Sequence, residues 1–441
     1  MLVGSYAPPP RPRTPPARLL RLPLPAAEGG ALTLEEALGA VERVSLTVLL
    51  SRESAVQALE AAHQQRAANL PNLSASLQQR RSQGVSIATV VVTSGRPANR
   101  FDALLTGSYA IYNPSLRVLA EASRTGAEVA RANQAAALQA VLADVAGGYF
   151  LNLRNLRRRE VLDANIARAQ ALLGLARSQL SAGVATQIDV TRAEAQLALA
   201  EQARLQHDTV VLQSQLLLQR ILDLPPGRPL QLAGFEVRRV PGTLQALGQE
   251  ETAFERRAEH LAARLAVDQS RLNIRAAERE RWPALTLTGN YGLASPRFDD
   301  PSKQDQWAFG VGVAMPVFDG FRLSAGRRIA QSRQRSQEAR LHHLELQISA
   351  ELRLAAQDAT SRHAQVAVAE KSLGLAREEL RLAEQRYQQG VADNREVVEA
   401  QNRLAQAEDN LVEAVHQYNL SRVELARVRG DVRTILAERA P

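Results

Sequence analysis

Apolar residues at the start of the chain follow two different periods. From about Leu32 they recur every three to four residues, as in an amphipathic helix, with Thr33 as the expected N-cap. This helix is predicted to end before Pro71. Apolar and polar residues then alternate from Leu73 to Leu77, and a period of two predicts a β-strand.

A second strand and two long helices are predicted next. Alternation around Leu105 and Ile111 gives the first strand a partner, so a strand pair is expected at about residues 70–112, with a long polar loop inside it. The helical period then runs over about 115–222. It is interrupted near Gly183, and a bend or break is also expected at Gly147–Gly148, because glycine lowers helix propensity.

The same order of patterns returns in the second half. A helix is predicted over about 251–281, a second strand pair over about 283–317 and helices over about 321–428, with a bend at Gly390. Bulky residues line one face of the last strand, and glycine and alanine line the other. The bulky residues are Trp307, Phe309, Val311, Val313 and Met315.

An internal repeat accounts for this order. LSAGVATQIDVTRAEAQ begins at Leu180, and YQQGVADNREVVEAQNR begins 207 positions later, at Tyr387. At this offset 11 of the 27 positions from Leu175 to Glu201 are identical. We therefore predict a disordered or leader-like N-terminal arm over 1–30, a first structural repeat over 31–233 and a second over 234–441.

The last helix carries a seven-residue repeat. Its large residues are Val397, Leu404, Leu411, Tyr418 and Leu425, and its smaller ones are Ala400, Ala407, Ala414, Ser421 and Val428. A heptad with one row of small residues favours close coiled-coil packing. The two helices that flank each Gly-Val-Ala bend are therefore expected to pair antiparallel.

Four amphipathic strands leave two arrangements open. They form either a small soluble sheet packed on helices or one share of a barrel built from several chains, since the smallest transmembrane barrels have eight strands. No stretch reaches about 18 consecutive apolar residues. A membrane crossing by this chain is therefore expected to use strands. The first 30 residues are rich in Pro and Arg and lack the apolar core of a signal peptide.

Composition and motifs narrow the function classes. Aromatic residues make up only 4% of the chain, which favours long Ala- and Leu-rich helices. The net charge of +8 is spread among nearly as many acids, without a basic stripe interleaved with aromatics, so we expect no nucleic-acid partner. Cysteine is absent, and no metalloprotease, P-loop, dinucleotide or serine-hydrolase motif occurs. No enzymatic activity, cofactor or metal is expected.

The ordered motifs resemble the TolC-like outer membrane efflux and secretion channel family. The resemblance covers about residues 31–430 and rests on LTLEEAL, LPNLSAS, WPALTLTGNYG, MPVFDG, LDLPPGRPL and the two Gly-Val-Ala segments. It implies a mainly α fold with a small β part. In such a fold a homotrimer forms a 12-stranded barrel in the outer membrane, and this barrel continues into an α-helical barrel in the periplasm. A belt around the middle would include the PPGRPL region, the 234–256 linker and the C-terminus.

The resemblance also implies a function and partners. The trimer would be a passive exit duct for efflux or type I protein secretion. It would work in outer membrane lipid with a periplasmic adaptor and an inner-membrane ABC or proton-driven transporter. The sequence does not say whether drugs, ions or protein toxins leave through it. The alternative is a soluble periplasmic coiled-coil adaptor or scaffold.

Residues at the two bends match a periplasmic gate in this family. They are Gly183, Asp189, Tyr387, Gly390, Glu396 and Glu399. In a trimer Glu396 and Glu399 would form carboxylate rings that favour cations, although both also suit an ordinary first helical turn. Tyr387 would tie neighbouring tip helices through Asp189. The arginine that completes this tie in the best-known family member is replaced by Ala392. Either Arg192 or Arg395 is expected to substitute for it, or fewer polar links hold the gate.

Overall fold

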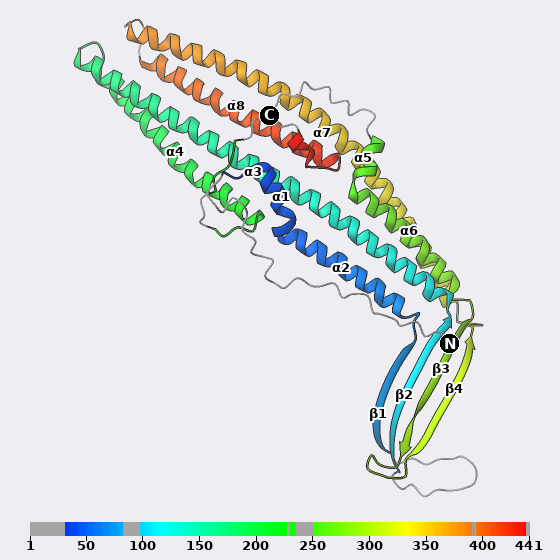
Figure 1. Ribbon diagram of the computed structural model, residues 1–441. Coiled ribbons are helices and arrows are strands. Elements are labelled where there is room, and N and C mark those ends of the chain that lie inside the picture. Colours follow the sequence, from blue (N-terminus) through cyan, green and yellow to red (C-terminus); the bar gives the residue numbers. More distant parts are fainter. Residues whose placement is uncertain are drawn as a thin grey trace. The chain divides into compact units, whose positions relative to one another are not determined.

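The computed structural model describes residues 31–82, 98–226, 230–234, 250–389, 391 and 394–437. The expected N-terminal arm over 1–30, the second bend glycine Gly390, and Ala392 lie outside the described residues. The helices are α1 (Leu34–Val44), α2 (Leu46–Ala67), α3 (Pro114–Ser181), α4 (Gln187–Ile221), α5 (Glu250–Arg256), α6 (Ala258–Arg279), α7 (Arg322–Gln388), α8 (Asn394–Val428) and α9 (Thr434–Ala437). The strands are β1 (Asn72–Ser82), β2 (Ala98–Tyr112), β3 (Ala284–Ser295) and β4 (Gln304–Ala314). The predicted mainly helical chain with a small sheet is confirmed (Figure 1).

Two helices predicted as continuous are each divided in two. Thr33 caps α1 in a full capping box with Glu36, as its position predicts. The helix then stops at Ser45, whose backbone is extended, and α2 starts at the next residue. The second division lies at Arg257, between α5 and α6. Neither break has a glycine or proline to mark it, so the apolar period alone gives no sign of it.

The Gly147–Gly148 pair does not interrupt α3, contrary to the expected bend or break. A Cβ on Gly148 would meet Leu218 and Ile221 of α4 at 3.6 Å, and one on Gly147 would meet Leu420 of α8 at 3.8 Å. Large side chains of two other helices therefore pack directly onto this backbone. Their contacts offset the low helix propensity of glycine.

The strands form one antiparallel sheet in the order β1-β2-β3-β4 (Figure 1). Both predicted strand pairs are present, and β2 pairs with β3, from Phe101 opposite Ser295 to Tyr112 opposite Leu285. Strands from the two predicted repeats therefore share one sheet. The division of the chain at residue 233 remains a prediction.

The chain gathers into two compact units. One holds the described residues up to Ser51, those of Ala135–Arg257 and those from Leu346 on; the other holds Arg52–Gln134 and Ala258–Glu345. The second unit contains the sheet and a small helical core formed by Val118 and Ala122 of α3 with Leu272 and Ala276 of α6. Each unit draws segments from both halves of the sequence.

The first unit has a core built from distant segments. Leu38 of α1, Phe150 of α3, Leu218 of α4 and Ile435 near the C-terminus are all buried together. The Tyr149 hydroxyl lies 2.6 Å from the carbonyl oxygen of Ala233 and 3.0 Å from that of Leu32. An isolated parallel bridge joins Leu32 to Leu232. Two parts of the belt that the resemblance implies pack against this core, namely residues 230–234 and the C-terminal segment around Val432 and Ile435.

By length and composition, α3 is the one helix among the described residues that could cross a membrane. A buried helix in the core of a soluble protein can have the same length and apolar composition. The helix has 68 residues, about 100 Å at 1.5 Å per residue, whereas a hydrocarbon core is about 30 Å thick. Its length therefore exceeds what a membrane span needs.

Candidate functional site

One face of the sheet is apolar and exposed across all four strands. In an antiparallel sheet, directly opposed residues point to the same side. The register aligns Ala75, Leu105, Tyr291 and Trp307 in one such row. The exposed large side chains of this face are Leu73, Leu77, Leu105, Leu287, Tyr291, Trp307, Phe309, Val311 and Val313. An apolar surface of this extent needs an apolar environment or a partner.

The opposite face carries small and polar side chains. It includes Ser74, Ser76, Thr106, Ser108, Thr288 and Asn290, with Gly310 and Gly312 on β4. The edge strands β1 and β4 each pair with only one neighbour within the described ranges. Unpaired strand edges are satisfied by another chain or by closure. A sheet with one apolar face, one polar face and two free edges is therefore suited to be a segment of a larger wall.

Four helices meet in the candidate tip. α3 pairs with α4, and α7 pairs with α8 (Figure 1). The shared core contains Val397, Ala400, Leu404 and Ala407 of α8, and Leu411 packs against it. Arg177 bridges to Glu194 at 2.8 Å in the first pair, and Arg403 to Glu379 at 2.8 Å in the second. The heptad seam predicted for the last helix is therefore buried over these positions.

Gly183 stands at the first bend with φ of +75°, a left-handed conformation that favours glycine. The amide of Val184 donates to the Gln179 carbonyl at 3.0 Å, which closes the end of α3. No atom outside the neighbouring residues lies within 4 Å of a Cβ placed on Gly183. The glycine is therefore required by the backbone and not by crowding.

Asp189 has a structural role at the start of α4. Its Oδ2 accepts hydrogen bonds from the Thr186 amide at 2.9 Å and the Thr186 hydroxyl at 2.7 Å. These bonds, with a smaller effect from Arg192, lower the pKa of Asp189 below its ordinary value. The nearest Arg192 nitrogen is 3.9 Å from Oδ1. Of the two expected substitutes for the missing arginine, only Arg192 contacts Asp189 in the single chain.

Tyr387 is buried close to Asp189, but no hydrogen bond joins them. Its side chain is 5% exposed, and its hydroxyl has no hydrogen-bond partner among the described residues. Burial and, secondarily, the charge of Asp189 raise the pKa of Tyr387. The predicted tie between tip helices is therefore not made within one chain.

Glu396 and Glu399 both lie in the first two turns of α8, beside arginines. The Glu396 carboxylate is 3.2 Å from Arg386 of α7, and Glu399 accepts a hydrogen bond from Arg395 Nε at 2.9 Å. Arg395 thus contacts Glu399 and not Asp189. An arginine lies beside each of the two carboxylates, so the negative electrostatic potential around them is weaker than that of an unpaired carboxylate.

Sequence reasoning missed Asn394, which joins the two hairpins. This residue is fully buried, and its Nδ2 donates to the carbonyl oxygen of Asp189 at 2.8 Å. In the sequence, only its position four residues after Gly390 points to a role for Asn394 at the bend. Within the described ranges, no group of three or more His, Asp or Glu residues could hold a metal ion.

Comparison with known proteins gives one family. The profile described as Outer membrane efflux protein matches residues 47–223 and 251–431. The pyoverdine export outer membrane protein OpmQ of Pseudomonas putida is 25% identical over 321 residues, which are 72% of this chain and 67% of the relative. The outer membrane protein OprJ of Pseudomonas aeruginosa is 29% identical over 316 residues, which are 67% of this chain and 62% of the relative. This chain thus spans about two thirds of the length of each.

A solved structure has the same fold. The outer membrane protein VceC of Vibrio cholerae superposes with a TM-score of 0.78 at 19% identity. The match covers 90% of this chain and 96% of VceC.

Proposed function

Because this chain belongs to the outer membrane efflux protein family, we propose that it is one of three identical subunits of a passive exit duct. The resemblance seen in the sequence is confirmed by the family match over both halves of the chain. The fold is confirmed by the likeness to VceC. The family places the chain in the outer membrane, and nothing in the comparisons favours the soluble adaptor.

The exposed apolar face of the sheet is the observation that carries the proposal. Four strands with two free edges do not close, but three copies supply 12 strands, an even number within the range of outer-membrane barrels. Closure would turn the apolar face to lipid and the polar face to a water-filled lumen. The edge strands β1 and β4 of neighbouring chains would pair.

The partners follow from the family as proposals. A passive duct supplies no energy for transport, so a pump in the inner membrane would supply it. An adaptor would connect the pump to the duct across the periplasm. OpmQ is named for pyoverdine export. For this chain, the passenger remains open between small molecules and secreted proteins. A duct requires no catalytic group, and we expect no enzymatic activity.

The tip residues are proposed to form the gate of this duct. Tyr387 carries a buried hydroxyl without a partner in the described chain, and Asp189 lies close to it. A neighbouring subunit would supply the missing hydrogen bond, because a buried unpaired hydroxyl costs about 1–3 kcal/mol. Gly183 and Gly390 would form the bends, and Glu396 and Glu399 the carboxylate rings.

The assembly is tested on the full chain purified from outer membranes in detergent. We expect a trimer by native mass spectrometry and discrete ion-conducting steps after reconstitution into planar bilayers. A monomer that stays soluble without detergent and forms no pore would instead support the adaptor.

A further inference from the structure

Two arginines face each other on the polar side of the sheet. Arg80 of β1 is directly opposite Arg100 of β2, and Asp102 of β2 lies opposite Gln78. Both arginines are exposed, and the Arg100 side chain is 62% exposed. Like charges at directly opposed positions destabilise a strand pair. Repulsion between the two guanidinium groups therefore destabilises this part of the sheet, and a bound anion would reduce that repulsion.

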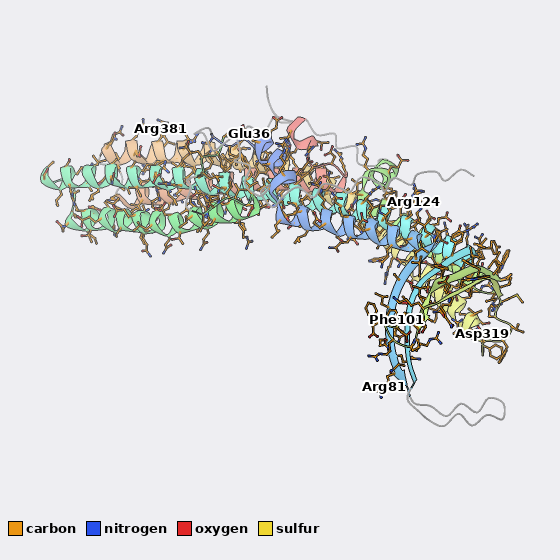
Figure 2. The ribbon with its side chains drawn as sticks, turned by 60° about the horizontal axis from the view of Figure 1, so that its bottom comes forward. Glu36, Arg81, Phe101, Arg124, Asp319 and Arg381 are labelled. Carbon is orange, nitrogen blue, oxygen red and sulfur yellow. The ribbon has the colours of Figure 1, made fainter. Side chains whose placement is uncertain are left out.

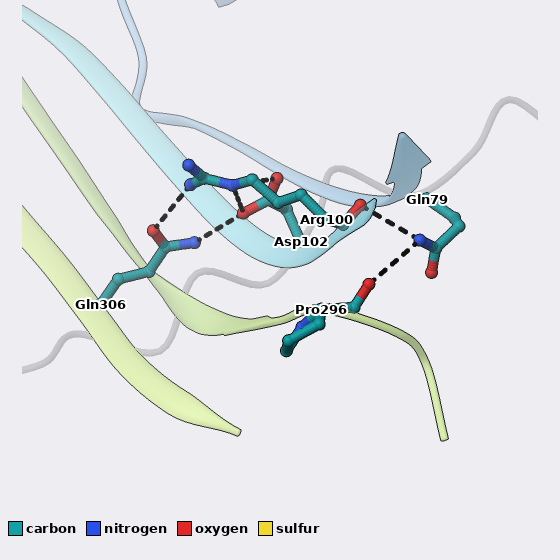
Figure 3. A network of polar contacts seen from close by, with 5 residues as sticks. All are labelled: Gln79, Arg100, Asp102, Pro296 and Gln306. Atoms are coloured by element: carbon teal, nitrogen blue, oxygen red, sulfur yellow. Dashed lines mark hydrogen bonds and ion pairs between the residues drawn. The ribbon is translucent and has the colours of Figure 1, made fainter. Parts of the chain in front are cut away.

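Arg100 is held in place by two side chains. Its Nε lies 2.9 Å from both carboxylate oxygens of Asp102, and its Nη2 is 3.5 Å from Gln306 Oε1 (Figure 3). Gln306 Nε2 in turn donates to Asp102 Oδ1 at 3.2 Å. The guanidinium is therefore oriented before any ligand arrives.

The network crosses β3, because Gln306 is on β4 and Asp102 on β2. Gln306 is paired with Gly292 of β3, which has no side chain to block the crossing. On the other side of the sheet, Gln79 donates to the carbonyl oxygens of Arg100 and Pro296 at 3.4 and 3.5 Å (Figure 3). Three strands are thus tied together at the level of Arg100.

We propose that Arg80 and Arg100 form an anion-binding collar in the lumen, which takes carboxylate, phosphate or sulfonate groups of passing molecules. Arginine presents a planar fork that matches such groups, and Arg100 already has its orientation fixed. Asp102 offsets only one of the two charges, so three chains would carry three excess positive charges at this level. This inference rests on the proposed function, because the trimer turns the polar face inward.

Citrate block of reconstituted channels tests the collar. Citrate is added on the side of the strand-connecting loops, and the potassium current is recorded at rising concentrations. In the double variant R80Q/R100Q we expect about tenfold weaker block, which corresponds to about 1.4 kcal/mol of lost citrate binding. Arg80→Gln alone breaks none of the hydrogen bonds described above, so it guards against misfolding; we expect about threefold weaker block from it.

Arg81→Gln is the matched control. Arg81 is the next residue of β1, but it points to the apolar side, opposite Asn99. Figure 2 shows Arg81 near the end of the sheet. Its loss removes the same charge and should leave citrate block unchanged. If citrate blocks R80Q as strongly as the native channel, the collar is overturned and the proposed function stands. The same holds if R81Q weakens citrate block as much as R80Q does. A chain that forms no pore overturns the proposed function and the collar with it.

Discussion

The capping box of α4 makes the tip sensitive to pH at a single residue. Substitution of Thr186 by Ala removes the hydroxyl donor to Asp189 and leaves the backbone amide donor in place, and loss of an N-cap side chain costs about 1 kcal/mol. We expect about fivefold less hydrogen-exchange protection in the first turn of α4 at pH 7. Thr191→Ala is the control, because that hydroxyl donates only to the Gln187 carbonyl within the helix.

The sign of the pH dependence follows from the lowered pKa of Asp189. A carboxyl whose folded pKa is depressed stabilises the fold above its unfolded pKa, about 4, and loses this effect as the pH falls through the folded pKa. The difference between T186A and the native chain should therefore shrink below about pH 4. A difference that stays constant from pH 7 to pH 3 would mean that the ionised carboxylate is not responsible.

The two acids of α8 allow a second test at the residue scale. In the double variant E396Q/E399Q we expect a lower ratio of potassium to chloride permeability in bilayer recordings, because rings of carboxylates concentrate cations. The effect should be modest, since Arg386 and Arg395 lie beside these acids. Glu378→Gln removes an acid of α7 that pairs with Arg381 and is the control. If both variants change selectivity equally, the ring hypothesis fails.

Among the elements, β3 lies directly against the backbone of β2 at Gly292. A Cβ on Gly292 would clash with the carbonyl oxygen of Ala103 on β2, whereas one on Gly312 of β4 would meet nothing within 4 Å. Gly292→Ala should therefore force β2 and β3 apart, at a cost of about 2 kcal/mol or more. Gly312→Ala should be tolerated. The shift of the folded band in unheated gel electrophoresis measures both, and equal behaviour of the two would contradict the clash.

Periodicity predicted the elements because each apolar row is a local property of the sequence. Both strand pairs and the four long helices lie within a few residues of their predicted places. The predictions were wrong where contacts with residues distant in the sequence determine whether a helix continues or ends. α3 continues through Gly147–Gly148 because α4 and α8 pack there, and α1 ends at Ser45 without any local breaker. The Asp102–Gln306 contact needs the register of strands some 200 residues apart, which no local pattern contains.

At the scale of the whole molecule, exposed apolar rows remain on the helices as well. Val368, Leu375 and Leu382 of α7 are spaced seven residues apart and are 69%, 66% and 47% exposed. Leu205 and Leu212 of α4 have the same spacing and are 71% and 54% exposed. An apolar heptad row on a long helix is the surface through which coiled-coil helices pack against each other. In a closed ring of identical chains, the α7 row of one chain would meet the α4 row of the next.

Leu375→Asp tests this seam in the intact protein. A buried unpaired charge is costly, so the variant should lose trimer by native mass spectrometry while its helix content by circular dichroism stays unchanged. The control is Arg377→Asp, which changes the charge of the same helix turn by more but lies on a different side of α7. Trimers that survive Leu375→Asp as well as they survive Arg377→Asp would place the contact between chains elsewhere. Because the hairpin core of α3, α4, α7 and α8 does not include Leu375, loss of the fold itself is not expected from either change.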